Sequence, residues 1–269
     1  MNCNGNFCLK GKVAFVAGGA GYLGTPVCIK LAGQGATVMI ADINKDRAFA
    51  AATEVADAVP GAKVGSVTMD ASDEFAVRKA IADTVEKFGG LDIMVNATCA
   101  AIGKLVEEIS PEEFDSALHG NLTSALFLAR ESAAAMKNGG SIVMFSSMYG
   151  RVSPDPRVYF APMKPNPIEY GVAKAGIEQM VRYLAVYYGP KNIRVNGVCP
   201  GPFPNQNVPS YKADLDGFRS FVDRLAGKVP MGRVGKRHEL AGPVTFLASD
   251  ESSFVNGHIL MVDGGWTAW

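Results

Sequence analysis

The sequence lacks the features that mark several large classes of protein. No hydrophobic run is long enough to cross a bilayer, so we expect no membrane-spanning segment. Basic and acidic side chains balance at 26 each without a basic block, which argues against nucleic acid as the main partner. No serine/glycine-rich, charged or low-complexity stretch divides the chain, so we expect one domain over residues 1–269.

Cysteine and histidine are sparse and scattered. The cysteines number five, an odd count, and form no Cys-x-x-Cys pair, so we expect neither a disulfide framework nor a zinc site. The three histidines, His119, His238 and His258, lie far apart, and we expect no bound metal. The segment Met1–Leu9 is rich in asparagine and has no apolar core, so we expect no signal peptide and a cytoplasmic location.

What the chain does contain is an alternation of short apolar runs with helical periodicity. Strands are expected at 12–17, 37–41, 62–69, 91–95, 141–145, 193–198 and 259–262. Helices are expected at 25–34, 45–58, 73–88, 110–137, 169–189, 214–226 and 237–248. This alternation predicts an α/β Rossmann fold, with a doubly wound, mostly parallel seven-stranded sheet flanked by helices. Ligands of such sheets bind at the carboxyl ends of the strands.

The turn between the first strand and the first helix is rich in glycine. Gly18, Gly19, Gly21 and Gly24 fall within seven residues. Glycine permits positive φ and close approach of a ligand, and the following helix N-terminus offers free N–H groups to a pyrophosphate. The turn therefore predicts a dinucleotide site, with an ordinary tight turn as the alternative.

The second strand ends at Asp42, eighteen residues beyond Gly24. A carboxylate in that place accepts hydrogen bonds from an adenosine ribose and repels a 2′-phosphate, which favours NAD over NADP. The third strand ends at Asp70, which either accepts from the adenine amino group or caps the helix that begins near Asp73. Gly120 and Asn121 are poor helix formers inside the expected long helix, so Asn121 either bonds backbone or water at a kink or is a tolerated surface residue.

Tyr170 and Lys174 stand four residues apart and share one face of an expected helix. An ammonium near a phenol lowers the tyrosine pKa from its reference of about 10, which makes the hydroxyl a usable proton donor and acceptor. A Tyr-x-x-x-Lys pair occurs often by chance and by itself is weak evidence for a site. The evidence becomes stronger because polar or turn residues end several strands at the same expected sheet edge: Asp42, Asp70, Asn96, Ser147 and Pro200-Gly201.

Together these residues resemble the short-chain dehydrogenases/reductases, in their short single-domain branch. The resemblance runs from about residue 9 to 265 and includes the glycine loop, Asn121, Ser147, Tyr170 with Lys174, and the tail at 262–265. It implies that Tyr170 is the general acid/base, that Lys174 lowers its pKa and binds the nicotinamide ribose, that Ser147 orients the substrate oxygen and that Asn121 holds a water for proton relay. It also implies a homotetramer formed through the helices at 110–137 and 169–189.

The implied function is an NAD-dependent oxidoreductase that interconverts a secondary alcohol and a ketone. The cofactor-binding residues expected are Gly18, Ala20, Gly21, Tyr22, Leu23, Asp42, Ile43, Asp70, Ala71, Asn96, Ala97, Tyr170, Lys174, Pro200, Gly201 and Phe203. The substrate-binding residues expected are Cys99, Ser147, Met148, Tyr149, Tyr159, Tyr170 and Phe203.

The chain departs from the branch pattern in its glycine loop. Tyr22 stands where the middle glycine is usual, and Gly18, Gly21 and Gly24 match the spacing of the family's extended branch, which includes epimerases and dehydratases. An NAD-retaining epimerase or dehydratase is therefore an alternative, although the chain is short for that branch. A non-catalytic dinucleotide-binding sensor is a second alternative, against which the retained tyrosine and lysine speak.

A second departure is the long interval between Ser147 and Tyr170, which exceeds the family's common spacing. We call residues 148–168 the insertion. It is expected either to border the substrate pocket or to pack against a neighbouring subunit. Its cationic residues would suit a carboxylate and its polar ones a sugar or polyol, so the substrate expected is a sugar, polyol or sugar acid. The segment 203–228 is expected to be a mobile lid.

Overall fold

The central strands of the sheet are short apolar runs buried on both faces, whereas the two edge strands are only partly buried. The computed structural model describes residues 6–161 and 163–269, and the strands are β1 (Val13–Ala17), β2 (Thr37–Asp42), β3 (Val64–Thr68), β4 (Ile93–Asn96), β5 (Gly140–Phe145), β6 (Ile193–Pro200) and β7 (Ile259–Val262). Their order across the sheet is β3-β2-β1-β4-β5-β6-β7, and every neighbouring pair is parallel. The predicted doubly wound α/β fold is confirmed, with a sheet that is entirely parallel.

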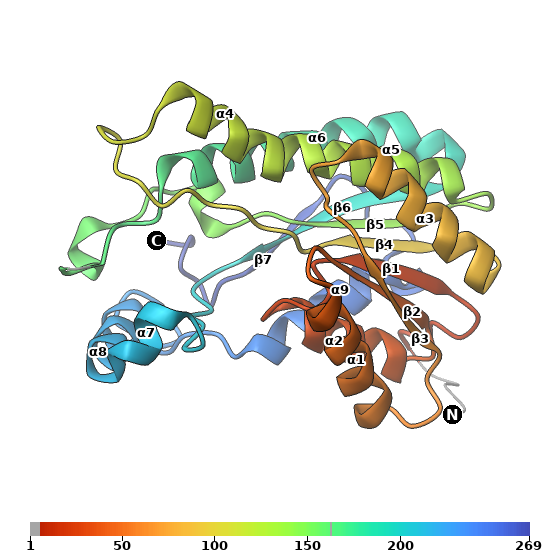
Figure 1. Cartoon of the computed structure of the whole chain (residues 1–269), viewed down its shortest axis with the longest axis horizontal. Coiled ribbons are helices and arrows are strands. Elements are labelled where there is room, and N and C mark those ends of the chain that lie inside the picture. The colour runs from red at the N-terminus through yellow and green to blue at the C-terminus, as the bar shows by residue number, and fades with distance from the viewer. Residues whose placement is uncertain (1–5, 162) are drawn as a thin grey trace.

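Helices cover both faces of this sheet (Figure 1). One face carries α3 (Glu74–Phe88), α4 (Pro111–Leu118), α5 (Ser124–Ala135) and α6 (Ile168–Tyr188), and the other carries α1 (Gly24–Gly33), α2 (Lys45–Ala58) and α9 (Ala241–Ala248). Within β1, Phe15 joins the first layer while Ala14 and Val16 join the second, as the strand period of two requires. Single-turn 3-10 segments lie at Met148–Gly150, Pro156–Val158, Gly189–Lys191, Arg237–Leu240 and Asp250–Ser252.

A side-chain cap begins α3. Asp73 accepts hydrogen bonds from the backbone N–H groups of Phe75 and Ala76 and so caps α3. Asp70 does not cap this helix, because its Oδ1 accepts instead from the N–H and hydroxyl of Ser72 at 2.9 and 2.7 Å. The capping alternative for Asp70 is therefore wrong.

The single long helix expected at 110–137 is interrupted. A π-helical turn, His119–Thr123, separates α4 from α5 and contains both Gly120 and Asn121. Asn121 bonds backbone groups in this turn: its Nδ2 donates to the Ala117 and Ala100 carbonyls at 2.9 and 2.7 Å, and its Oδ1 accepts from the Ala100 N–H at 3.1 Å. The surface alternative for Asn121 is wrong, since the residue is 1% exposed.

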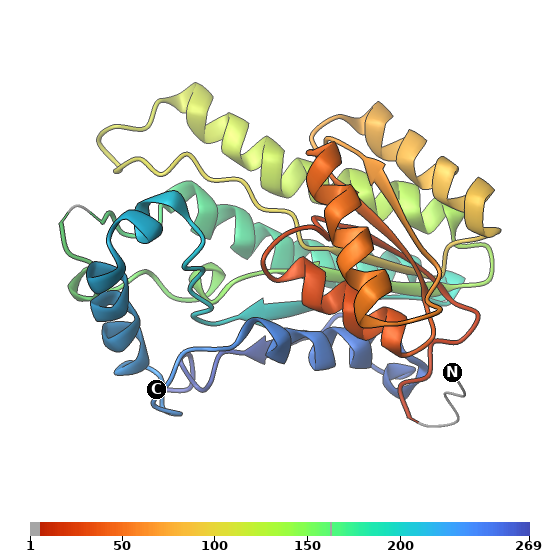
Figure 2. The same ribbon diagram turned by 60° about the horizontal axis from the view of Figure 1, so that its bottom comes forward.

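The insertion packs against helices of its own chain. Within 203–228 the chain forms α7 (Pro209–Ala213) and α8 (Leu215–Ala226), and Figure 2 shows both beyond the sheet edge. The guanidinium of Arg224 on α8 donates to the Arg157 carbonyl at 3.2 Å, and Lys228 forms an ion pair with Asp155. A third apolar cluster, which we call the cap cluster, joins both segments to the C-terminal tail through Met148, Val158, Phe221, Leu225, Val229 and Trp266.

Two further observations concern only the part of the chain that the structure describes. There, no helix is long and apolar enough to cross a membrane. Within the same residues, no group of three or more histidine, cysteine and acidic side chains is arranged to hold a metal ion. Residues 1–5, which form much of the segment expected not to be a signal peptide, lie outside the described ranges.

Candidate active site

A cavity of about 1130 Å³ opens at the carboxyl edge of the sheet. The edge is set by the parallel strands, and it gathers segments that are far apart in sequence: the glycine turn, the loops after β4 and β5, the insertion and α8 (Figure 1). The expected cofactor and substrate residues that line it are Gly18, Gly21, Tyr22, Leu23, Asp42, Ile43, Asp70, Ala71, Ala97, Cys99, Ser147, Met148, Tyr149, Tyr159, Tyr170, Lys174, Pro200, Gly201 and Phe203.

The glycine turn is a tight cradle that side chains would fill. Gly18 has a φ of +72°, and a Cβ there would lie 2.7 Å from the Ala97 carbonyl oxygen. A Cβ on Gly24 would collide with the Gly18 carbonyl. Thr25 braces the turn, since its hydroxyl donates to the Gly19 carbonyl at 3.2 Å. The first turn of α1 has no side-chain cap, and Leu23 and Gly24 at its start line the cavity. This backbone fits the pyrophosphate of a dinucleotide.

The second strand ends in a nearly buried carboxylate. Asp42 is 7% exposed, and its Oδ1 accepts from the Asn44 N–H at 3.0 Å. Its Oδ2 lies 3.6 Å from the guanidinium of Arg47, a cavity-lining cation that the sequence did not single out. The carboxylate is thus held at the place where an adenosine ribose would lie, with a cation beside it.

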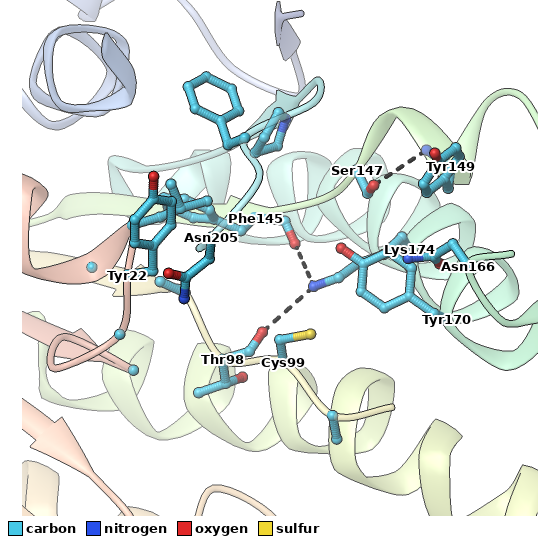
Figure 3. Close-up of a pocket in the computed structure, with 18 of the residues that line it drawn as sticks. Tyr22, Thr98, Cys99, Phe145, Ser147, Tyr149, Asn166, Tyr170, Lys174 and Asn205 are labelled. Atoms are coloured by element: carbon cyan, nitrogen blue, oxygen red, sulfur yellow. Dashed lines mark hydrogen bonds between the residues drawn. The ribbon is translucent and has the colours of Figure 1, made fainter. Parts of the chain in front are cut away.

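Three polar side chains meet farther along the cavity (Figure 3). Tyr170 and Lys174 come from the first turns of α6, and Ser147 follows β5. The Lys174 ammonium donates to the carbonyl of Phe145 at 3.0 Å and to that of Thr98 at 3.5 Å. It also lies 5.5 Å from the centroid of the Tyr170 ring. The lysine therefore ties the loop after β4 and the end of β5 to the start of α6.

The Tyr170 pKa differs from the expectation. Burial raises this pKa above its ordinary value, the neighbouring Cys99 raises it further, and the nearby Ser147 side chain lowers it in part. The expected lowering by Lys174 is not seen in the protein alone, because the ammonium points at two carbonyls and the ring face. Burial also lowers the pKa of Lys174 itself.

Three expected residues do not line the cavity. The side chain of Asn96 is buried, and its Oδ1 accepts from the N–H and hydroxyl of Thr98, which shapes the turn after β4. Both polar atoms of the Asn121 side chain are hydrogen-bonded to backbone groups of Ala100 and Ala117. The side chain therefore holds the segment after β4 and does not line the cavity. Ala20 offers its carbonyl to Arg47 at 3.3 Å.

The sequence did not single out Glu169. This carboxylate is fully buried, and its Oε1 accepts from the N–H groups of Ile102 at 3.0 Å and Gly103 at 3.3 Å. It holds the segment after β4 against the start of α6. The sequence pattern does not reveal this role, because the partners of Glu169 are backbone groups about 67 positions earlier in the chain.

Some residues of α7 and α8 that the sequence did not predict also line the cavity. Tyr211, Phe221 and Leu225 line it, and the Phe221 ring lies 5.9 Å from Tyr211 and 5.6 Å from Tyr159 between centroids. The helical spacing of Phe218, Phe221 and Leu225 was the available signal, since it predicts one apolar face of α8.

Known proteins match nearly the whole chain. A sequence model of the family described as Enoyl-(Acyl carrier protein) reductase matches residues 19–267. Versicolorin reductase stcU of Emericella nidulans is 32% identical, over 98% of this chain and 99% of its own. The 3-oxoacyl-(acyl-carrier-protein) reductase FabG of Thermotoga maritima is 31% identical, over 96% of this chain and 98% of its own. The structure of an NAD⁺-bound xylitol dehydrogenase superposes with a TM-score of 0.83 at 27% identity, covering 96% of this chain and 99% of that one.

The chain belongs to the short-chain dehydrogenase/reductase family, as its motifs predicted. Members of this family are oxidoreductases that bind a nicotinamide dinucleotide and act on small molecules. The cavity described above provides a place for both.

Loss of the Glu169 carboxylate is expected to loosen the segment after β4. Glu169→Ala leaves two backbone N–H groups without their acceptor, at a cost of roughly 2–4 kcal/mol of unfolding free energy. Thermal unfolding and hydrogen exchange at the Ile102 and Gly103 amides measure the effect. Glu169→Gln, which keeps one acceptor oxygen, should lose less. The exposed Glu86→Ala is the control, and equal stability of Glu169→Ala and Glu86→Ala would contradict the assignment.

Proposed function

We propose that this protein is an NAD-dependent oxidoreductase that interconverts a secondary alcohol and a ketone, with Tyr170 as the general acid/base. The observation that carries the proposal is the meeting of Ser147, Tyr170 and Lys174 in the same cavity as the glycine turn. We further propose that residues 1–269 form one nucleotide-binding domain, with the insertion and 203–228 enclosing the substrate.

Oxidation of a secondary alcohol requires the removal of a proton from oxygen and a hydride from carbon. The bound nicotinamide supplies the hydride acceptor. The Tyr170 oxygen takes the hydroxyl proton, and the Ser147 hydroxyl donates a hydrogen bond to the developing alkoxide. In the reverse direction the same tyrosine returns the proton to the ketone oxygen.

Lys174 keeps part of its donor capacity for a ligand. An ammonium has three N–H donors, and within the described residues two of them are taken by the Phe145 and Thr98 carbonyls. The third suits a hydroxyl of the nicotinamide ribose. Its positive charge, together with that of an oxidised nicotinamide, would oppose the effect of burial on the Tyr170 pKa.

The preference for NAD rests on Asp42. Its nearly buried carboxylate would accept hydrogen bonds from the ribose hydroxyls and repel a 2′-phosphate. The related xylitol dehydrogenase is a protein whose structure holds NAD⁺, which supports the same choice here. Arg47, beside Asp42, is the group that would favour NADP if the carboxylate were absent.

Among the substrates expected from the sequence, a neutral sugar or polyol suits the site better than a sugar acid. The insertion's cations are already paired: Arg157 with Asp155 at 2.8 Å, and Lys164 with Glu108 at 2.6 Å. Arg151 pairs with Glu178 at 3.0 Å. A substrate carboxylate would have to break one of these pairs.

We also propose a homotetramer assembled through the outer surfaces of α6 and of the helices α4 and α5 within residues 110–137. Tyr183, Val186 and Tyr187 of α6 are 66%, 81% and 59% exposed, a concentration of apolar surface on one helix that a second copy would cover.

Removal of the Tyr170 hydroxyl tests the mechanism. We expect Tyr170→Phe to lose about 10³-fold in kcat/KM, the scale of general acid/base catalysis, while NAD still binds. NADH absorbance with a turned-over alcohol and NAD titration of protein fluorescence measure the two properties. Phe49→Tyr on the exposed side of α2, which changes a ring hydroxyl outside the cavity, is the matched control. Turnover of Tyr170→Phe near that of the unchanged protein would exclude this mechanism, and isomerisation without net NADH would favour the epimerase alternative.

The lowering of the Tyr170 pKa by the neighbouring Ser147 side chain predicts a shift in the pH profile. Alcohol oxidation needs the deprotonated tyrosine, so its rate rises as the pH passes through the Tyr170 pKa. Ser147 lowers that pKa, and Ser147→Ala should therefore move the rising limb to higher pH. Ser146→Ala is the control, because the Ser146 hydroxyl bonds Glu178 and the Lys174 carbonyl instead. An unmoved limb in Ser147→Ala would show that Ser147 does not bond the tyrosine.

Cofactor selection should depend on the pairing of Asp42 with Arg47. Asp42→Ala removes the repulsion of a 2′-phosphate and frees Arg47 to bind one, so the NAD/NADP ratio of kcat/KM should fall roughly 10- to 100-fold. Steady-state kinetics with both cofactors measure the ratio. The exposed neighbour Asp46→Ala should leave it unchanged. An unaltered ratio in Asp42→Ala would remove the basis for NAD preference.

A further inference from the structure

The insertion brings two tyrosine hydroxyls together in the cavity wall. Tyr149 follows Ser147 by two residues, and Tyr159 lies after the next turn of the insertion. Their hydroxyl oxygens are 2.8 Å apart, and both residues line the cavity. Such a pair shares one hydrogen bond, in which one hydroxyl donates and the other accepts.

The two hydroxyls carry two O–H donors, and only one of these donors is used in the hydrogen bond between them. Whichever hydroxyl donates within the pair, the other keeps its own O–H proton. Among the described residues no acceptor bonds either hydroxyl apart from the other member of the pair. The backbone N–H of Asn166 lies near enough to the Tyr159 oxygen to lower the Tyr159 pKa, and a donor of this kind leaves the spare O–H unaffected. The pair therefore offers one O–H donor to a ligand.

The pair lies close to the proposed reaction centre. The Tyr149 N–H donates to the Ser147 Oγ at 3.2 Å, so the backbone of Tyr149 sets the position of the catalytic serine (Figure 3). Tyr170 and Tyr211 are near enough to the Tyr149 phenol to raise its pKa electrostatically, although burial is the main cause of that rise.

The surrounding wall is apolar and offers no unpaired charge. Met148, Phe221 and Leu225 line the cavity next to the pair, and Tyr211 stacks on Phe221. Lys164 also lines it, but its ammonium is bound to Glu108. A buried, neutral donor in such a wall favours a neutral acceptor, because a charged one would lose its hydration without gaining a counter-charge.

We propose that the Tyr149–Tyr159 pair binds a second, uncharged oxygen on the carbon next to the reacting one. The substrate class is then a vicinal diol and the matching α-hydroxy ketone, carried on a ring whose apolar faces pack against Phe221 and Leu225. This assignment rests on the proposed alcohol–ketone chemistry at Tyr170. It makes the insertion the segment that selects the substrate.

Paired substrates test the assignment by turnover. With NAD, cis-cyclohexane-1,2-diol should exceed cyclohexanol in kcat/KM by about tenfold, the value of one net neutral hydrogen bond. In the double variant Tyr149→Phe/Tyr159→Phe, which keeps both rings, that ratio should fall to about one. Phe49→Tyr/Phe254→Tyr, which changes the ring hydroxyl at two exposed positions outside the cavity, is the matched control and should keep the ratio. A ratio near one in the unchanged protein, or a ratio that survives the double variant, would overturn the proposal.

A binding measurement separates this proposal from the proposed reaction. In the NAD-loaded Tyr170→Phe protein, calorimetry should show cis-cyclohexane-1,2-diol binding about tenfold more tightly than cyclohexanol. Adding Tyr149→Phe/Tyr159→Phe should abolish that difference. Failure of every alcohol to reduce NAD would refute the proposed reaction, while the binding difference would still support the hydroxyl pair. Equal binding of the two probes would refute the pair even if both were oxidised.

Discussion

The buried ammonium of Lys174 is the contact on which the candidate site depends. It is 2% exposed, and its hydrogen bonds reach the last residue of β5 and the loop after β4. A buried cation is costly unless its donors are satisfied, so these two carbonyls must stay in place for the helix to dock. Through this contact the chain fixes the distance between the catalytic helix and the strand ends, and the Tyr170 ring is held over the cavity as a result.

A second set of polar contacts holds the segment after β4 from its other side. Asn121 bonds the N–H and the carbonyl of Ala100. Glu169 accepts from the N–H groups of Ile102 and Gly103. The π-helical turn supplies the first of these anchors, since it lets the buried amide of Asn121 reach out of the helix. The part of the cavity wall that carries Cys99 is therefore held in place by two side chains, Asn121 and Glu169, that do not themselves line the cavity.

The sequence predicted the sheet and much of the cavity lining because those signals are local. Apolar runs ended near the observed strand ends, the glycine turn had the expected context, and Tyr170 and Lys174 were separated by one helical turn. It did not predict the roles of Glu169 or the pairing of Tyr149 with Tyr159, which join residues through tertiary contacts. It also assigned the Tyr170 pKa from one neighbour, whereas burial outweighs any single neighbour in the folded chain.

The cap cluster has a consequence for how such a protein can change. Phe221 and Leu225 belong both to this small core and to the cavity wall, and Trp266 near the C-terminus packs in the same cluster. A substitution that enlarges the cavity there also removes packing that attaches α8 to the insertion and the tail. A change in substrate preference at these positions therefore also loosens the packing of α8. Compensating substitutions are expected near Trp266, which packs in the same cluster although it lies far from Tyr170 in the sequence.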